Sequence, residues 1–139
     1  MALDEELRRI ADAAVTYCAE GEDLTGIVPA EPAGGVRVYV CAYRDGDDTS
    51  WLVLDAEGHA VDDRSLVRDA VSIAALYELA EDAAGGDGEE ARIATPAALD
   101  ALGAAAEDHG SFVEAMKRAT GTVEELVRDV EGRYKRPLS

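Results

Sequence analysis

The spacing of hydrophobic residues predicts a helix at the start of the chain, over residues 3–20. Its apolar positions recur every three or four residues and are Leu3, Leu7, Ile10, Ala14 and Tyr17. This period places them on one face of a helix, which Gly21 is expected to end. Residues 21–35 contain several glycines and prolines and follow no period, so they are predicted to form a long connection.

Residues 36–61 alternate between two classes of side chain and predict a three-stranded antiparallel meander. The first strand places Val36, Val38, Val40 and Ala42 on one face and Arg37, Tyr39, Cys41 and Tyr43 on the other. A turn at residues 45–48 leads to a second strand at 51–54. A turn at 55–58 then leads to a short third strand at 59–61.

Residues 63–83 predict a long central helix that is apolar around most of its circumference. Such a helix is usually buried on two sides. Residues 84–90 are glycine-rich and acidic and are predicted to be a mobile loop, and residues 91–94 suit a short edge strand. Three more helices are predicted, with starts at Thr95, Ser111 and Thr122. The predicted fold is therefore one α+β domain over residues 1–139, with an N-terminal helix, a meander, a central helix and three C-terminal helices.

The charge balance changes which partners are plausible. Thirty acidic and thirteen basic residues give a formal net charge of −17. Such a field repels nucleic-acid phosphates and anionic membranes, so neither partner is expected, whereas a basic protein partner stays open. Arginine outnumbers lysine, and together with the acidity this suggests a high-salt cytoplasm in which ions screen the self-repulsion.

The start of the chain is acidic and lacks the apolar core of a signal peptide. The longest uncharged helical stretch, residues 70–77, is too short to span a bilayer. We therefore expect a cytoplasmic protein. Its two thiols, Cys18 and Cys41, should be reduced and act as small buried hydrophobic groups.

No segment has the spacing of a catalytic or cofactor-binding motif. The acidic turn at Asp45 lacks the glycine and glutamate positions of a calcium loop. Neither His59 nor His109 shares a helical face with a carboxylate in a zinc-site pattern. No serine elbow or phosphate-binding glycine loop is present, and Cys41 has no adjacent base. No metal, cofactor or catalytic residue is assigned.

Two less charged surfaces are the candidate sites. The first is the strand face with Arg37, Tyr39, Cys41, Tyr43, Leu52 and Leu54, where the two leucines are predicted to lie opposite Cys41 and Tyr39. Since both faces of the meander are apolar, this one could form a ligand pocket or subunit contact, or be covered by an ordinary helix. The second surface is Ser72, Leu76 and Leu79 on the far side of the central helix. It suits a dimer contact or packing against the C-terminal helices.

These observations favour a non-enzymatic module for homo-oligomeric interaction or small-ligand sensing. One alternative is a small enzyme or enzyme subunit that uses carboxylates, with or without a divalent metal. Another is an acidic inhibitor of a basic protein partner.

Overall fold

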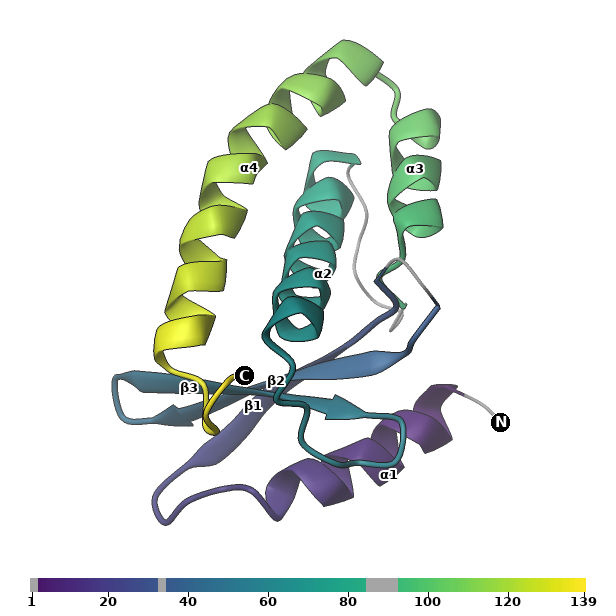
Figure 1. Cartoon of the computed structure of the whole chain (residues 1–139). Coiled ribbons are helices and arrows are strands. Elements are labelled where there is room, and N and C mark those ends of the chain that lie inside the picture. The colour runs from purple at the N-terminus through teal and green to yellow at the C-terminus, as the bar shows by residue number, and fades with distance from the viewer. Residues whose placement is uncertain (1–2, 33–34, 85–92) are drawn as a thin grey trace.

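A computed structural model describes residues 3–32, 35–84 and 93–139 (Figure 1). It confirms an α+β fold with a first helix, a three-stranded antiparallel sheet, a long helix and further helices. The elements are α1 (Leu3–Val15), β1 (Asp23–Ala30), β2 (Val38–Asp45), β3 (Asp48–Asp55), α2 (Arg64–Ala84), α3 (Pro96–Ala105) and α4 (His109–Gly132). The predicted acidic loop at 84–90 and the short strand predicted at 91–94 lie mostly outside the described residues.

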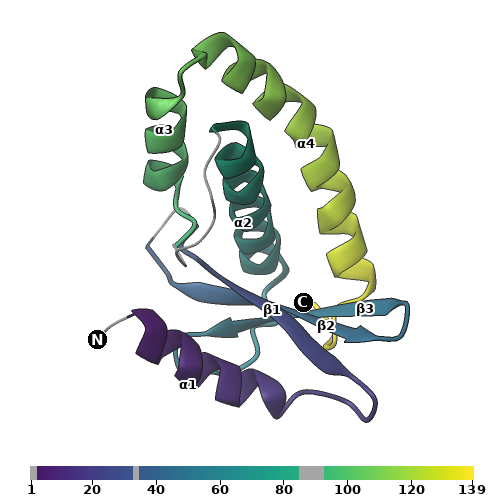
Figure 2. The same ribbon diagram turned by 180° about the vertical axis from the view of Figure 1, so that it is seen from behind.

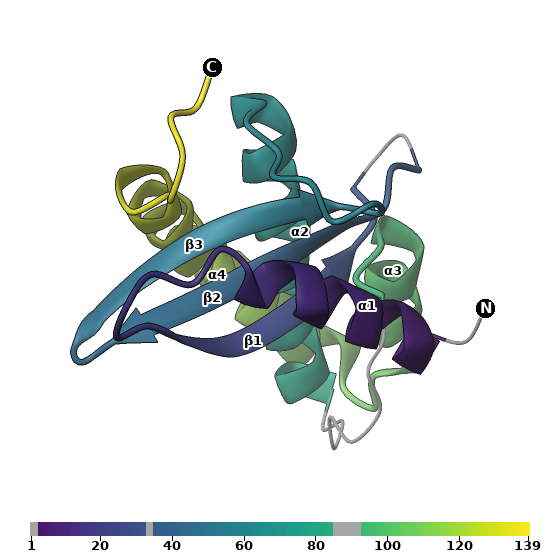
Figure 3. The same cartoon turned by 90° about the horizontal axis from the view of Figure 1, so that it is seen from below.

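The molecule has helices on both faces of one sheet. Helix α1 lies across one face, as Figure 3 shows from below. Helices α2, α3 and α4 stand on the other face, with α2 between the other two (Figures 1 and 2). Among the described helices, none is both long enough and apolar enough to cross a membrane.

The sheet has the order β1-β2-β3, with β2 at its centre. The pairs Tyr39–Leu54 and Cys41–Leu52 have the predicted register. Strand β1 was not predicted, because it lies inside residues 21–35, which were expected to form a connection. A bulge between Leu24 and Gly26 interrupts its alternation. Pro29 fits because β1 is an edge strand, and its outward carbonyl accepts a hydrogen bond from the Ala94 N–H at 2.9 Å.

The third strand predicted at residues 59–61 is reduced to a single bridge between Leu54 and Ala60. The chain turns back too sharply after β3 to form a longer ladder, because the Asp55 N–H already donates to the His59 carbonyl at 2.9 Å. Two of the three predicted C-terminal helices are one continuous helix, α4. Its buried residues Phe112, Ala119, Val123 and Val127 keep a helical period through Gly121, so the chain has no reason to break there.

Two apolar clusters hold the layers together. On the α1 side, Ile10 and Ala14 cover the alternate strand residues Tyr39, Cys41 and Tyr43. On the other side, α2 is buried between the sheet and the helices α3 and α4, as its two apolar sides predict. Burying one large aliphatic side chain contributes about 1.5–3 kcal/mol, so these clusters dominate the stability.

The C-terminal tail joins α4 to the sheet. The backbone N–H of Trp51 in β3 donates to the Arg133 carbonyl at 3.1 Å, and the Trp51 carbonyl accepts from the Lys135 N–H at 2.9 Å. The Lys135 ammonium forms a largely buried ion pair with Glu22 and lies 4.5 Å from the centre of the Tyr43 ring. This ion pair lowers the pKa of the Glu22 carboxyl.

Replacing either of the two buried tyrosines of β2 by phenylalanine should affect the stability differently. The Tyr43 hydroxyl donates to the Ala14 carbonyl at 2.7 Å, whereas the Tyr39 hydroxyl has no hydrogen-bond partner in the described part of the chain. Replacing Tyr43→Phe should lower the free energy of unfolding by about 1–2 kcal/mol, because a buried hydrogen bond is lost. The matched change Tyr39→Phe should be neutral or slightly stabilising. Urea unfolding of both variants measures this, and equal losses would contradict the assignment.

Candidate functional site

The tyrosine-bearing face of the sheet lies inside the protein. Tyr39, Cys41, Tyr43, Leu52 and Leu54 are all fully buried beneath α1. A ligand or partner could reach them only if α1 moved away, so helix cover accounts for this face of the described structure. Burial also raises the pKa of the Cys41 thiol to about 12, which keeps it protonated and makes it a poor nucleophile.

Arg37, the sixth residue of that predicted face, precedes β2 and is only partly buried. Its guanidinium contacts the Glu6 carboxylate of α1 at 3.0 Å and the Glu31 carboxylate at 3.3 Å. These two ion pairs hold α1 against the segments that flank the β1–β2 connection. Arg37 therefore links elements of the fold and is itself neutralised.

The residues predicted for a helix contact, Ser72, Leu76 and Leu79, are all partly buried. Leu76 and Leu79 pack against the core beside α2. Ser72 lines a cleft of about 590 Å³ between α2 and α4. Leu79 lines a second cleft of about 390 Å³ between the same two helices. Packing against the C-terminal helices thus accounts for much of this surface.

A third hollow is more apolar and lies between the sheet and the helices above it. We call it the sheet–helix groove, and its volume is about 250 Å³. Its lining residues come from all three strands and from α2 and α4: Thr25, Gly26, Val28, Val40, Ala42, Trp51, Val71, Ala74, Ala75, Glu78 and Leu126. Sequence reasoning placed Val40, Ala42 and Trp51 on this face but expected no site there.

The groove is open because Gly26 has no side chain and the side chain of its neighbour Ala42 is small. A side chain at Gly26 would meet no atom within 4 Å of its Cβ, so there is free space above this residue. Gly26 pairs with Ala42, whose small side chain is only partly buried. Glycine inside a strand often marks a bulge or a place where a ligand approaches the backbone.

Trp51 forms one wall of the groove and is held firmly in place. Its backbone is paired with the C-terminal tail on both sides of Tyr134. Its indole N–H donates to the Asp129 carboxylate of α4 at 3.2 Å. That carboxylate is itself paired with Arg133 at 3.1 Å. The indole is thus preorganised, with its ring only partly buried.

Among the described residues that line the groove, Glu78 is the only charged one. Burial raises the pKa of its carboxyl group, and the neighbouring carboxylates of Asp82 and Glu81 raise it further. Its side chain remains exposed, so water still solvates the carboxylate. Its position in the sequence gave a weak signal, since it is an acid four residues after the apolar Ala74 on the same side of α2.

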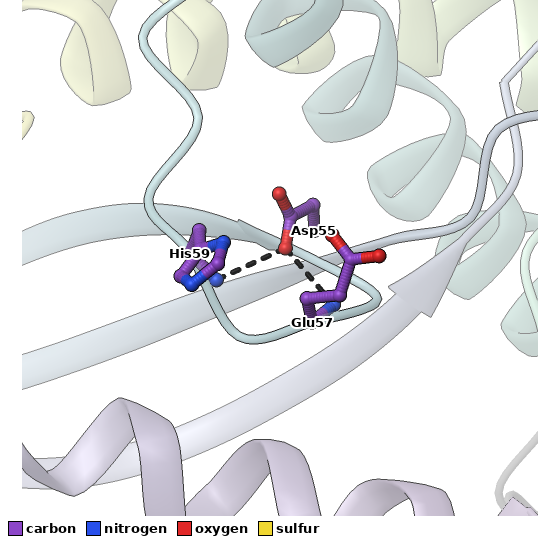
Figure 4. A group of neighbouring side chains, drawn as sticks. All are labelled: Asp55, Glu57 and His59. Atoms are coloured by element: carbon purple, nitrogen blue, oxygen red, sulfur yellow. Dashed lines mark hydrogen bonds between the residues drawn. The ribbon is translucent and has the colours of Figure 1, made fainter.

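A second, smaller constellation lies in the turn between β3 and α2. Ligand atoms of Asp55, Glu57 and His59 lie within 4.8 Å of one another. The backbone N–H groups of Glu57 and His59 both donate to Asp55 Oδ1, at 2.9 and 3.0 Å (Figure 4). The second Asp55 oxygen and the other two side chains are at or near the surface. Sequence reasoning missed this group, although acids and a histidine at alternate positions around Gly58 were visible.

The turn is held against α1 through Gly58. This residue has a φ of +84°, and a Cβ built on it would lie 2.7 Å from the Ala13 Cβ. Only glycine satisfies both the left-handed backbone and the close contact. The backbone that presents the three side chains is therefore fixed, whereas their ends face solvent.

Comparison of the chain with protein-family models, curated proteins and solved structures found no match in any of the three.

Proposed function

We propose that this protein is a non-enzymatic binding module that senses a small apolar ligand in the sheet–helix groove. The observation that carries the proposal is an open, mostly apolar hollow of about 250 Å³ between the sheet and the helices α2 and α4. Ligand sites are usually concave and mostly apolar, with few polar groups that set orientation. Here the polar groups are Thr25 and Glu78, and Trp51 provides a rigid aromatic wall.

A binding role fits better than catalysis for two reasons. The described lining of the groove contains one ionisable side chain, whereas acid–base catalysis generally needs a base and an acid or a stabilising donor within reach of the reacting atoms. The described cysteine with a strongly shifted pKa, Cys41, lies on the opposite, covered face of the sheet. The predicted homo-oligomer through Ser72, Leu76 and Leu79 stays a prediction, which light scattering would test.

Filling the groove should abolish binding and stabilise the protein. In Gly26→Leu the new side chain meets no atom within 4 Å of its Cβ, and the loss of glycine's backbone freedom should raise the free energy of unfolding by about 1 kcal/mol. A panel of neutral and charged small molecules, screened by saturation-transfer NMR, should give ligands for the wild type that Gly26→Leu no longer binds.

The control is Gly121→Leu on the exposed side of α4, which also adds a leucine to open space. This variant should keep every ligand. Binding that survives Gly26→Leu, or a panel without any ligand, would contradict the proposed function.

A second candidate function is metal binding at Asp55, Glu57 and His59. It is favoured by one specific observation, the convergence of an imidazole and two carboxylates on one fixed turn. Such a set of three ligands suits a divalent transition-metal ion and leaves coordination positions for water. This constellation would be the centre of the metal-dependent alternative that the acidic sequence leaves open.

The two histidines of the chain provide a matched test of the metal site. Calorimetric titration with Zn²⁺ should show one ion bound per wild-type chain. Replacing His59→Ala should weaken the affinity at least about tenfold, since one of three ligands is lost. His109→Ala, at the start of α4, should leave it unchanged. Equal affinities in the two variants would rule out this site.

A further inference from the structure

In the part of the chain that the structure describes, the lining of the groove has one charged side chain, that of Glu78. Among the described residues, no lysine or arginine lies within ion-pair distance of Glu78, although eight other ion pairs are formed. The rest of the lining is apolar except for the Thr25 hydroxyl and the Trp51 indole N–H. The indole N–H already donates to Asp129. Glu78 is thus the group that a bound molecule would pair with.

The surroundings of the groove select the sign of that molecule. Asp82 and Glu81 lie one helical turn after Glu78 on α2, and both add negative potential at its carboxylate. The whole chain carries a formal net charge of −17. A carboxylate or phosphate group would therefore be repelled from this opening, whereas a cation would be attracted and would relieve the repulsion on Glu78.

We propose that the sheet–helix groove binds a small primary amine with an apolar body, whose ammonium group pairs with Glu78 and whose hydrocarbon lies against Trp51. This inference rests on the proposed function and names its ligand class. Charge-assisted hydrogen bonds between ammonium and carboxylate are about twice as strong as neutral ones. They offset the cost of removing the charged head from water.

The size of the groove limits the ligand. Its volume of about 250 Å³ lies just below the usual range of sites for drug-sized molecules, about 300–1,000 Å³. An amine with a six-carbon chain fits this space, whereas a folded peptide segment does not. We therefore assign the groove to a free small amine of about this length.

The test compares three probes that share one hydrocarbon chain: hexylamine, hexanol and hexanoate. Trp51 is the only tryptophan of the chain, so its fluorescence reports on the groove alone. At neutral pH and constant ionic strength, hexylamine should bind at least about tenfold more tightly than hexanol, which corresponds to one strong charged contact. Hexanoate should bind more weakly than hexanol.

Two substitutions assign the preference to its cause. Glu78→Gln should reduce the affinity for hexylamine to that for hexanol and leave hexanol binding unchanged. Glu81→Gln removes the same charge from α2 but does not line the groove, so the preference for hexylamine should persist. Gly26→Ala, a milder change than the leucine, should weaken the binding of hexylamine and hexanol together. Circular dichroism confirms that each variant is folded.

The outcomes distinguish a failure of the amine assignment from a failure of the proposed function. Equal affinity for hexylamine and hexanol, or a preference that survives Glu78→Gln, would overturn the amine assignment while the groove remains a binding site. If none of the three probes changes Trp51 fluorescence, both the amine assignment and the proposed function fail.

Discussion

A three-stranded sheet with two apolar faces must be covered on both sides, and this constraint shapes the whole molecule. Because β2 alternates aromatic and aliphatic side chains, neither of its faces can be left to water. Helix α1 covers the face with Tyr39, Cys41 and Tyr43. The long helix α2, supported by α4, covers most of the face with Val38 and Val40. The ion pairs of Arg37 and Lys135 then fix α1 and the C-terminal tail to the sheet.

Helix α1 covers its face of the sheet more completely than α2 and α4 cover the other face. The candidate groove lies where this second cover is incomplete. Helix α1 lies along the sheet, whereas α2 rises steeply from it (Figure 1). A steep helix leaves part of the sheet beneath it uncovered, and the uncovered part here includes Gly26 and the partly buried Ala42 and Trp51. A glycine inside a strand weakens it, and the pKa of the Glu78 carboxyl at the edge of the groove is raised. Such local costs are typical of functional sites, where stability is exchanged for binding.

The sequence predicts the parts of the fold that depend on local periodicity. The alternation in β2 and the acidic turn after it fix the register of β3, and Thr95 caps α3 where its start was predicted. The strand β1 was missed because a bulge and a proline interrupt its alternation. The groove was missed for another reason: it depends on the angle of α2 to the sheet and on a side chain that Gly26 lacks. Neither is encoded in a local pattern.

Two neighbouring residues on β2 distinguish the two faces of the sheet, since Cys41 faces the sealed side and Ala42 faces the groove. The reaction rate of a thiol with N-ethylmaleimide measures this, in a Cys18→Ser background that leaves one thiol at a time. The thiol introduced by Ala42→Cys, with Cys41→Ala, should react at least about 100-fold faster than native Cys41 under native conditions, because Cys41 is buried and protonated. Similar rates at the two positions would contradict the sealed face and the open groove alike.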